Sequence, residues 1–539
     1  ANLGSRTSIL VGGGYRDVSR LRSGGVVTNP GFPMPMVPRF EADGKTQLGT
    51  GFEEATFDTR LLHRLSPELQ VVGAVYGYLQ SDAPRTDQCP PSEAPADECL
   101  SIASERRVLS YASLRGNAGK QIRDLELTLS YQHYGEHRVR DRPRSGVAFD
   151  WRDRVGTYGL SLRAATRDFR WGEARHWKLR YGADAYRDGV ESKAEQAFTD
   201  IRRSFALSRG QYLSDSSYLL VGAYSELEVQ PLPWMTWRGG GRVSGVGIRA
   251  PGDPESGSRA VSKNLSAVVG RVGVEIRPAE PIAILANFDQ GFRSPNLDDL
   301  TSRQQVGPGF QFENADLRPE RSNTFELGLR ATFSWLQFDA WSYATLIDDA
   351  IVRAVRVVDD CPPNTPQCAS SRQQYQLVNA AGAARVLGSE GGATLYLPFE
   401  IALRGTIAYA WGSAPNTTPR SADPTILYQE RVPLSRVPPL NGTVELRWRH
   451  LRSGIYLGFA TRWALSQERL APSDLTDTRI PIGGTPGYTL FDVRAGWRFR
   501  ENLRVSIVLE NLLDSAYRVH GSSINGPGRG FLTLLEAGL

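Results

Sequence analysis

Four cysteines lie in two local pairs, and each pair closes a short segment rich in proline. Cys89 and Cys99 enclose PPSEAPADE, whereas Cys361 and Cys368 enclose PPNTPQ. Cysteines that close short loops indicate disulfide bonds and an oxidising setting. A metal site is the alternative, but no histidine lies near either pair in the sequence. We therefore expect two disulfides at loop tips, with no metal ion and no cofactor.

The remaining reactive residue types form no catalytic pattern, so we expect a protein that is not an enzyme. The six histidines are scattered, and His133 and His137 would lie about 13 Å apart on one face of a strand, too far for one metal ion. Glycine runs such as Gly12–Gly14 follow strand-like segments and enter no helix, which argues against a nucleotide cradle.

Charged and aromatic residues in long connections rich in glycine and proline are candidates for contacting a ligand. The alternative is that they are ordinary solvated loop residues. The candidates, chosen by position alone, are Asp298, Asp299, Arg303, Asp359, Asp360, Arg420 and Tyr428.

The segments that flank these connections alternate between apolar and charged residues. From Phe491 to Phe499, apolar residues occupy one face while Asp492, Arg494 and Arg498 occupy the other. The same period of two recurs at 125–131, 177–186, 325–330 and 444–449. Strands that are apolar outside and charged inside are typical of a transmembrane β-barrel with a wet interior.

Long and short connections also alternate along the chain. Segments such as 278–281 and 500–502 are short, whereas 81–104, 190–211, 293–320 and 348–380 are long. Outer-membrane barrels have short periplasmic turns and long extracellular loops. We therefore predict an all-β fold, an antiparallel transmembrane barrel of about 20–22 strands, each of roughly 10–14 residues.

The composition agrees with one large β unit rather than several soluble domains. The 539 residues carry 63 basic and 58 acidic side chains, and their mean hydropathy is −0.35. No apolar run approaches the roughly 18 residues of a spanning helix, which is expected when only alternate residues face lipid. No basic run interleaved with aromatics indicates nucleic acid as a partner. The start ANLGSRTS does not have the pattern of a signal peptide, so we expect either a mature product or a trimmed one.

Several motifs, in the right order, resemble those of TonB-dependent receptors of the Gram-negative outer membrane. The segment FRSPN is similar to the Phe-Arg-Ala-Pro segment of that family, and NADLRPERS is similar to its Asn-Pro-Asp-Leu-x-Pro-Glu-x-Ser run. Near the C-terminus, ENLLD and PGR resemble the closing motifs. We interpret the matching residues as mainly structural: Phe292, Arg293, Pro295, Asn296, Asn314, Asp316, Leu317, Pro319, Glu320, Asn379, Asn511, Asp514, Tyr517, Pro527, Gly528, Arg529 and Phe531.

The resemblance implies energised uptake of a scarce, siderophore-like or otherwise bulky small molecule across the bacterial outer membrane. It also implies three partners, namely outer-membrane lipid, a plug domain and a TonB-type inner-membrane protein. We expect residues 1–539 to be barrel, with the plug missing or supplied in trans; a plug and one further hairpin before Ala1 would give the 22 strands of the family. Residues 296–313 contain no histidine, which argues against haem. The alternative is an open pore or a structural barrel subunit of an outer-membrane assembly.

Overall fold

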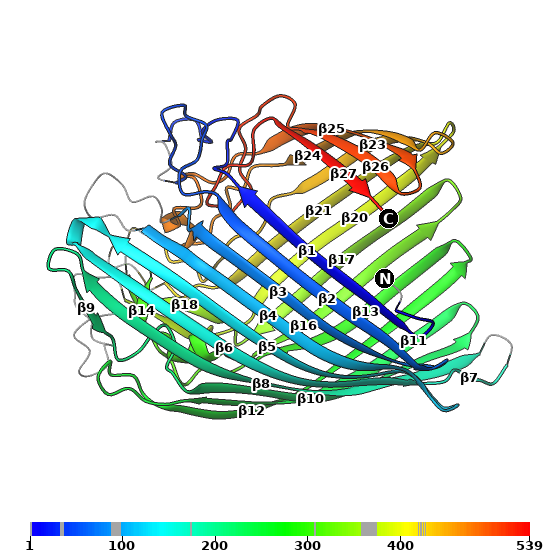
Figure 1. The fold of residues 1–539 in the computed structure, drawn as a ribbon, viewed down its shortest axis with the longest axis horizontal. Helices are drawn as coiled ribbons and strands as arrows, with labels where there is room; N and C mark the ends of the chain where they lie inside the picture. The colour runs from blue at the N-terminus through cyan, green and yellow to red at the C-terminus, as the bar shows by residue number, and fades with distance from the viewer. Residues whose placement is uncertain are drawn as a thin grey trace.

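The computed structural model describes residues 3–32, 37–87, 99–172, 175–306, 309–356, 374–418, 420, 423, 425 and 427–538. Most of these residues form one large antiparallel sheet that curls around a central space (Figure 1). A second, small sheet of four strands belongs to the loops. Long connections gather at one end of the curled sheet and short turns at the other (Figure 1). The sheet therefore has the sidedness that the connection lengths predict.

Each long strand pairs with the next long strand along the chain. They are β1 Thr7–Val18, β2 Phe52–Ser66, β3 Leu69–Pro84, β4 Cys99–Ala118, β5 Ile122–Arg142, β6 Val147–Thr166, β8 His176–Phe198, β10 Ser216–Leu232, β11 Met235–Ala250, β12 Val261–Ala279, β13 Ile282–Arg293, β16 Glu320–Thr332, β17 Leu336–Asp348, β20 Ala384–Leu397, β21 Ile401–Pro415, β23 Asn441–His450, β24 Ile455–Ala464, β25 Tyr488–Arg500, β26 Leu503–Glu510 and β27 Gly530–Ala537.

Shorter elements lie at the long-loop end and beside the ends of the long strands. Three short strands join the main sheet: β7 Phe169–Arg170, β9 Arg203–Ala206 and β22 Arg431–Pro433. The loop sheet consists of β14 Gln304–Val306, β15 Gly309–Phe312, β18 Ile351–Arg356 and β19 Gln374–Asn379. A one-turn helix, α1, spans Leu297–Thr301, and 3-10 turns span Pro143–Ser145 and Asp474–Thr476. Within the described residues, no helix has the length and hydrophobicity of a membrane span.

Alternation gives the sheet an apolar outer face and a charged inner face. On β10, Leu219, Val221 and Leu227 lie on the outer face and are exposed, whereas Glu226 and Glu228, at alternate positions, lie on the inner face. The predicted alternation of β25 follows the same rule, because Trp497 and Phe499 are exposed on one face while Asp492 on the other is buried and bonded to Arg462. The predicted all-β architecture is thus confirmed.

Several strands are longer than the expected 10–14 residues, and four of them reach 20 residues or more. β4, β5, β6 and β8 have 20, 21, 20 and 23 residues. Their hydrogen-bonded ladders continue beyond the apolar belt, where outward positions carry residues such as Arg106, Arg154 and Glu191. Apolar alternation stops there although the strands do not, so the segments 81–104 and 190–211, expected as connections, are partly strand.

The two ends of the sheet are joined at the long-loop end by connecting segments. The segment between β1 and β2 meets the segment between β26 and β27, with a bridge between Ser23 and Pro527 and a hydrogen bond from Gly528 N to the carbonyl of Arg22 at 2.9 Å. Gln47 and Asn525 are fully buried at this contact. We call this contact the seam.

Candidate functional site

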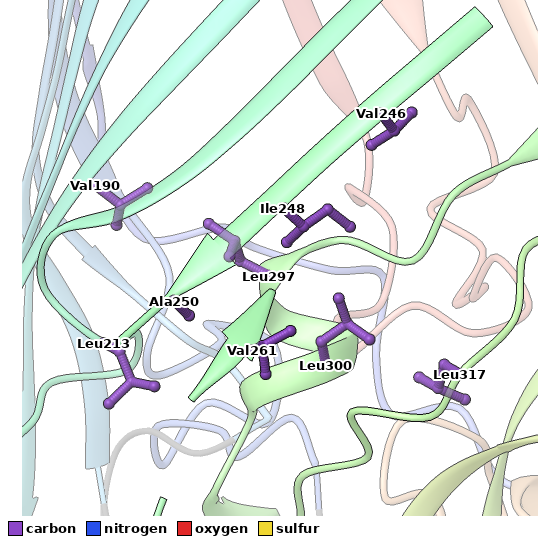
Figure 2. Close-up of a cluster of buried hydrophobic side chains, with 9 residues drawn as sticks. All are labelled: Val190, Leu213, Val246, Ile248, Ala250, Val261, Leu297, Leu300 and Leu317. Carbon is purple, nitrogen blue, oxygen red and sulfur yellow. The ribbon is translucent and has the colours of Figure 1, made fainter. Parts of the chain in front are cut away.

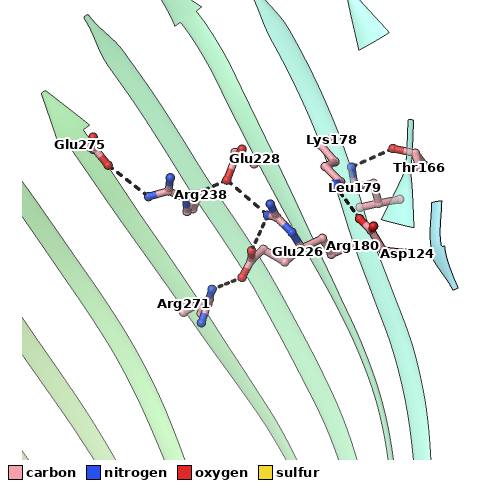
Figure 3. Close-up of polar contacts among 10 residues, drawn as sticks. All are labelled: Asp124, Thr166, Lys178, Leu179, Arg180, Glu226, Glu228, Arg238, Arg271 and Glu275. Carbon is pink, nitrogen blue, oxygen red and sulfur yellow. Dashed lines mark hydrogen bonds and ion pairs between the residues drawn. The ribbon is translucent and has the colours of Figure 1, made fainter. Parts of the chain in front are cut away.

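The inner wall of β8, β10, β11 and β12 carries a continuous row of ion pairs (Figure 3). Arg180 binds Glu226 at 3.2 Å and Glu228 at 3.3 Å, and Arg271 also binds Glu226. Arg238 continues the row with Glu228 at 2.9 Å. Opposite charges alternate across neighbouring strands, so each charge is compensated while it still faces the central space. The wall can therefore stay wet and polar without a net charge.

The opposite inner wall, from β17 to β26, is hollowed by two adjoining cavities of about 960 and 450 Å³. The larger is lined by residues of both signs from β17, β20, β21 and β23, including Asp339, Glu390 and Arg404. The smaller is lined by arginines of β23, β25 and β26, including Arg494 and Arg498. The central space thus offers polar contacts of both signs to a solute.

At the long-loop end, part of the interior is filled by a small apolar core (Figure 2). Val190, Val246 and Ile248 contribute the inner faces of β8 and β11, and α1 and its neighbouring segments contribute Leu297, Leu300, Leu213 and Leu317. Ile248 and Leu300 are fully buried. Loop segments therefore fold back onto the inner wall and narrow the opening on this side. We call this region the mouth core.

Arg209 anchors the segment that follows β9 to the mouth core. Its guanidinium donates to the Ser258 hydroxyl at 2.7 Å, to the Gln211 carbonyl at 2.8 Å and to the Thr301 carbonyl at 3.0 Å. Burial lowers the pKa of Arg209. A buried cation that is satisfied by neutral acceptors fixes loop geometry, because each lost acceptor would leave a costly unpaired donor.

Beside Arg209, a polar network connects the mouth core to the wall. Arg138 of β5 donates to Asp153 of β6 at 2.9 Å and also contacts Gln211. The amide of Gln211 donates to the Tyr212 hydroxyl at 3.3 Å and to Asp298 at 3.5 Å. Burial raises the pKa of Asp298, and burial raises the pKa of Tyr212 to about 12. This network places an acid, a phenol and an amide together at the opening.

The motif residues around 292–320 hold α1 and the loop sheet in place. Asn296 caps α1 by accepting from Asp299 N at 2.8 Å, and the Asp299 carboxylate accepts from Asn296 N at 3.0 Å. Arg293 binds Asp299 at 2.7 Å and Glu320 at 3.3 Å. Phe292 packs against the mouth core, and Pro295 is fully buried.

Asn379, at the end of β19, connects these motifs to the loop sheet. Its amide accepts from Arg318 N at 2.8 Å and donates to the carbonyls of Arg318 at 2.9 Å and Asp349 at 2.7 Å. Asn314 donates to the Leu377 carbonyl at 2.8 Å and accepts from Asp316 N at 3.0 Å. Leu317 is buried in the mouth core, and Pro319 directly precedes β16, whose first residue is Glu320. The motifs thus converge on one support for the opening.

The C-terminal motif residues converge on the seam. The side-chain amide of Asn511 donates hydrogen bonds to the carbonyls of Ser515 at 2.9 Å and Pro527 at 3.0 Å. The backbone of Asn511 itself has a positive φ. Asp514 binds Lys45 at 2.6 Å and accepts from Arg529 N at 2.8 Å.

The other residues of this motif set are packed tightly, apart from one. Tyr517 is buried with its ring 5.0 Å from that of Tyr488. A side chain at Gly528 would lie 2.9 Å from the backbone of Ser23 and Gly24, so only glycine fits there. Phe531 is exposed on the outer face of β27. The seam therefore accounts for most of these residue choices.

The loop candidates do not gather at one point. Asp298 and Asp299 belong to α1, and Arg303 binds Glu313 at 2.9 Å. Arg420 binds Glu430 at 3.0 Å and lies over the ring of Tyr428 in a different loop. Asp359 and Asp360 lie outside the described residues. Only Asp298 joins the network at the opening, and a contact of any of these residues with a ligand stays a prediction.

The cysteine pairs fall mostly outside the described part of the chain. Cys99 begins β4 and is disulfide-bonded. Cys89, Cys361 and Cys368 lie outside the described residues, so the expected pairing stays a prediction. Within the residues that the structure describes, no group of three or more histidine, cysteine, aspartate or glutamate side chains is placed to hold a metal ion.

Sequence reasoning missed Arg209, Gln211 and Tyr212. They belong to LSRGQYLSD, a polar stretch that reads as a solvated loop. Their role depends on burial against α1, which lies some 90 residues further along the chain. No local pattern reports such a contact.

Comparisons with known proteins agree with this architecture. The sequence model of the family described as "TonB dependent receptor-like, beta-barrel" matches residues 101–512. No curated protein matches the sequence.

Solved structures resemble the chain over nearly its whole length. One is a copper transporter, OprC, with TM-score 0.76 and 17% identity, covering 99% of this chain and 76% of that one. The FrpB iron transporter of Neisseria meningitidis matches with TM-score 0.71 and 14% identity, covering 99% and 77%. A double mutant of the Serratia marcescens hemophore receptor HasR matches with TM-score 0.70 and 15% identity, covering 99% and 76%. The family match covers well over half of the sequence, and the chain belongs to the TonB-dependent receptor family.

Proposed function

We propose that this protein is a receptor of the bacterial outer membrane that captures a scarce solute and passes it inward in an energised step. Family membership supports this proposal, because the related structures carry the names of transporters and receptors. No part of the proposal requires a catalytic role.

The polar inner wall is the observation that carries the proposal. Arg180, Glu226 and Arg271 line the central space, whereas Leu219, Val221 and Leu227 are exposed on the outer face. Such a sheet is stable where water fills its interior and hydrocarbon surrounds it. Outer-membrane lipid is therefore the first partner that we infer.

The cargo that we propose is a bulky chelate of the siderophore kind. Related structures include proteins named as siderophore receptors from Pseudomonas aeruginosa and Acinetobacter baumannii. The adjoining inner cavities, with acidic and basic linings, can bind a polar solute larger than a bare ion. Energy would come from a TonB-type inner-membrane protein that acts on a plug domain.

Uptake in living cells tests this function. Cells with and without the full chain, grown under iron limitation, would receive radiolabelled iron on hydroxamate and catecholate chelators. We expect one chelate to enter by saturable uptake that requires this chain and stops when an uncoupler collapses the inner-membrane proton gradient. Uptake that rises linearly with chelate concentration and is unchanged by the uncoupler would favour the alternative, an open pore. Equal uptake of every chelate without the chain would contradict the siderophore proposal.

A further inference from the structure

The smaller of the two inner cavities, of about 450 Å³, lies where β23–β26 reach the short-turn end of the sheet. Leu451 and Gly454, from the turn between β23 and β24, form its rim. Its lining contains five arginines and a single acidic residue: Arg447, Arg449, Arg494, Arg498, Arg504 and Glu445. We call this cavity the arginine pocket. Its charge is one-sided, so the partners of its arginines decide what it can bind.

Only part of this positive charge is compensated within the described residues. Arg447 binds Glu445 at 2.8 Å, and Arg504 binds Glu536 of β27 at 3.2 Å. In the part of the chain that the structure describes, no acidic side chain forms an ion pair with Arg449, Arg494 or Arg498. Arg449 and Arg498 are exposed to the central space, so their guanidinium groups are accessible to an anion.

The ladder places two of these arginines on either side of a bare stretch of backbone. Arg447 of β23 and Arg494 of β25 both pair with Gly458 of β24, so their Cα atoms lie roughly 10 Å apart, at two strand spacings. Gly458 is buried and has no side chain that could fill the space between them. One compact anion can therefore contact guanidinium groups from both strands.

A tyrosine ring forms the floor of the pocket one row nearer the turn. Tyr456 pairs with Arg449 on one side and with Gly496 on the other. A Cβ atom at Gly496 would overlap the ring of Tyr456, so the ring lies over this glycine. Arg494 and Arg498 lie two positions before and after Gly496 on β25, and they share its face. Arginines thus surround a flat floor on several sides.

The opposite inner wall is balanced at the same end of the sheet. A small cavity of about 180 Å³ there is lined by Glu228, Glu275, Arg238 and Arg277. Arg238 binds Glu228 at 2.9 Å, and Arg277 binds Glu275 at 2.6 Å. A wet wall can therefore be built here without excess charge, and the arginine pocket departs from that pattern.

We propose that the arginine pocket binds a small solute that carries two or more negative charges on carboxylate or phosphate groups. Arginine suits such groups because its planar fork donates two parallel hydrogen bonds to either of them. The volume is that of a small-molecule site. The pocket shares Glu445, Arg447 and Arg449 with the larger cavity, whose lining has both signs, so the two form one path towards the short-turn end.

This inference rests on the proposed function and extends it, because it makes the cargo an anion. A chelate that binds first among charges of both signs would be held again, by arginine alone, before it leaves the central space. An acidic peptide segment is the other occupant that such a pocket could accept, and the experiment below separates the two.

Calorimetric titration of the purified full chain, in non-ionic detergent at low salt, tests the proposal. The probes are citrate and inorganic pyrophosphate, with acetate as the singly charged comparison. We expect at least one of the two polyanions to bind, and the tighter one identifies the preferred oxyanion. Arg494→Gln/Arg498→Gln should weaken its binding about tenfold, because two charge-assisted hydrogen-bonding groups are lost. Neither substitution leaves an acidic partner unpaired within the described residues.

Two further variants separate this site from general attraction and from misfolding. Arg494→Lys/Arg498→Lys keeps both charges but loses the planar forks, and should weaken binding by a smaller factor. Arg107→Gln removes an exposed arginine from the inner face of β4, outside the pocket, and should leave affinity unchanged. All variants should keep the heat-modifiable migration of the folded parent protein.

Three results would overturn the proposal. These are equal binding by the parent and Arg494→Gln/Arg498→Gln, acetate binding as tight as that of the polyanions, and no binding of either polyanion to the parent chain. The last result would favour an acidic peptide segment as the occupant. Failure of the proposed function would look different, since chelate uptake would then be independent of this chain while the purified protein still bound the polyanion.

Discussion

Gln47 and Asn525 exchange two hydrogen bonds although 478 positions separate them. The Gln47 amide donates to the Asn525 carbonyl at 3.0 Å, and Asn525 N donates to the Gln47 amide oxygen at 2.8 Å. Both residues are fully buried. The pair joins the segment after the first strand to the segment before the last one, so it ties together the two ends of the sheet.

Replacing Gln47 with leucine should destabilise the seam. Gln47→Leu leaves the amide and carbonyl of Asn525 buried without partners, which costs about 2–4 kcal/mol for two groups. The melting temperature of the folded barrel, followed by its heat-modifiable migration on gels, measures the loss. Gln429→Leu makes the same change at an exposed loop position and should have almost no effect. Equal melting of the two variants would contradict a role for the seam in stability.

His520 gives the seam region a defined response to acid. Burial lowers the pKa of His520 from its usual 6.5, and its ring contacts the Thr485 hydroxyl at 2.9 Å. Because its pKa is lower in the folded state, His520 binds a proton more readily in the unfolded chain. Its contribution to the stability of the folded state is therefore complete above about pH 6.5 and is lost as the pH falls below that value.

The variant His520→Gln tests this sign. Melting temperatures of the parent protein and the variant would be compared between about pH 7.5 and pH 5.5. We expect the parent to lose more stability on acidification than the variant does. The surrounding groups Asp474, Asp477 and Arg436 are present in both proteins, so the difference isolates His520. An identical slope in the two proteins would contradict the prediction.

Asn379 should control the order of the loops over the opening. Asn379→Ala removes three hydrogen bonds to the backbone of Arg318 and Asp349. Local opening should become easier by about 1–3 kcal/mol, because three hydrogen bonds that hold these loops together are lost. Hydrogen exchange should therefore accelerate in β18, β19 and residues 314–318, while β16 and β17 keep their protection.

Asn416→Ala is the matched control for this measurement. Asn416 also bonds loop backbone, through a 2.9 Å contact to the Gln429 carbonyl, but it lies in another loop. Its replacement should leave exchange in β18 and β19 unchanged. Faster exchange throughout the sheet in Asn379→Ala would show that the residue supports the barrel rather than the opening.

The sequence predicted the sheet well because alternation records the two environments of each strand. In β25, Trp497 and Asp492 lie on the faces that their polarity indicated. Strand ends were predicted less well, because Arg106 and Arg154 end the apolar pattern while the ladder continues past them. Polarity reports where the membrane belt ends, whereas hydrogen bonding decides where the strand ends.

The interior of the opening could not be predicted from local patterns. Arg209 reads as a solvated loop residue, yet it is buried against the carbonyl of Thr301. Gln47 and Asn525 carry no signal of their pairing, because amide side chains are common in loops. The motif around Asn511 was identified by resemblance alone, and its positive φ and its bonds to Pro527 explain the choice of asparagine physically.

Residue-by-residue labelling of β10 tests most directly whether this sheet separates a wet interior from lipid. Single cysteines would replace Glu226, Leu227, Glu228 and Val229 in the full chain, in outer-membrane vesicles, and react with a membrane-impermeant thiol reagent. We predict rapid labelling at the positions of Glu226 and Glu228, which bind arginines of the inner wall, and slow labelling at the positions of Leu227 and Val229. Uniform labelling at all four positions, or the opposite alternation, would contradict the account.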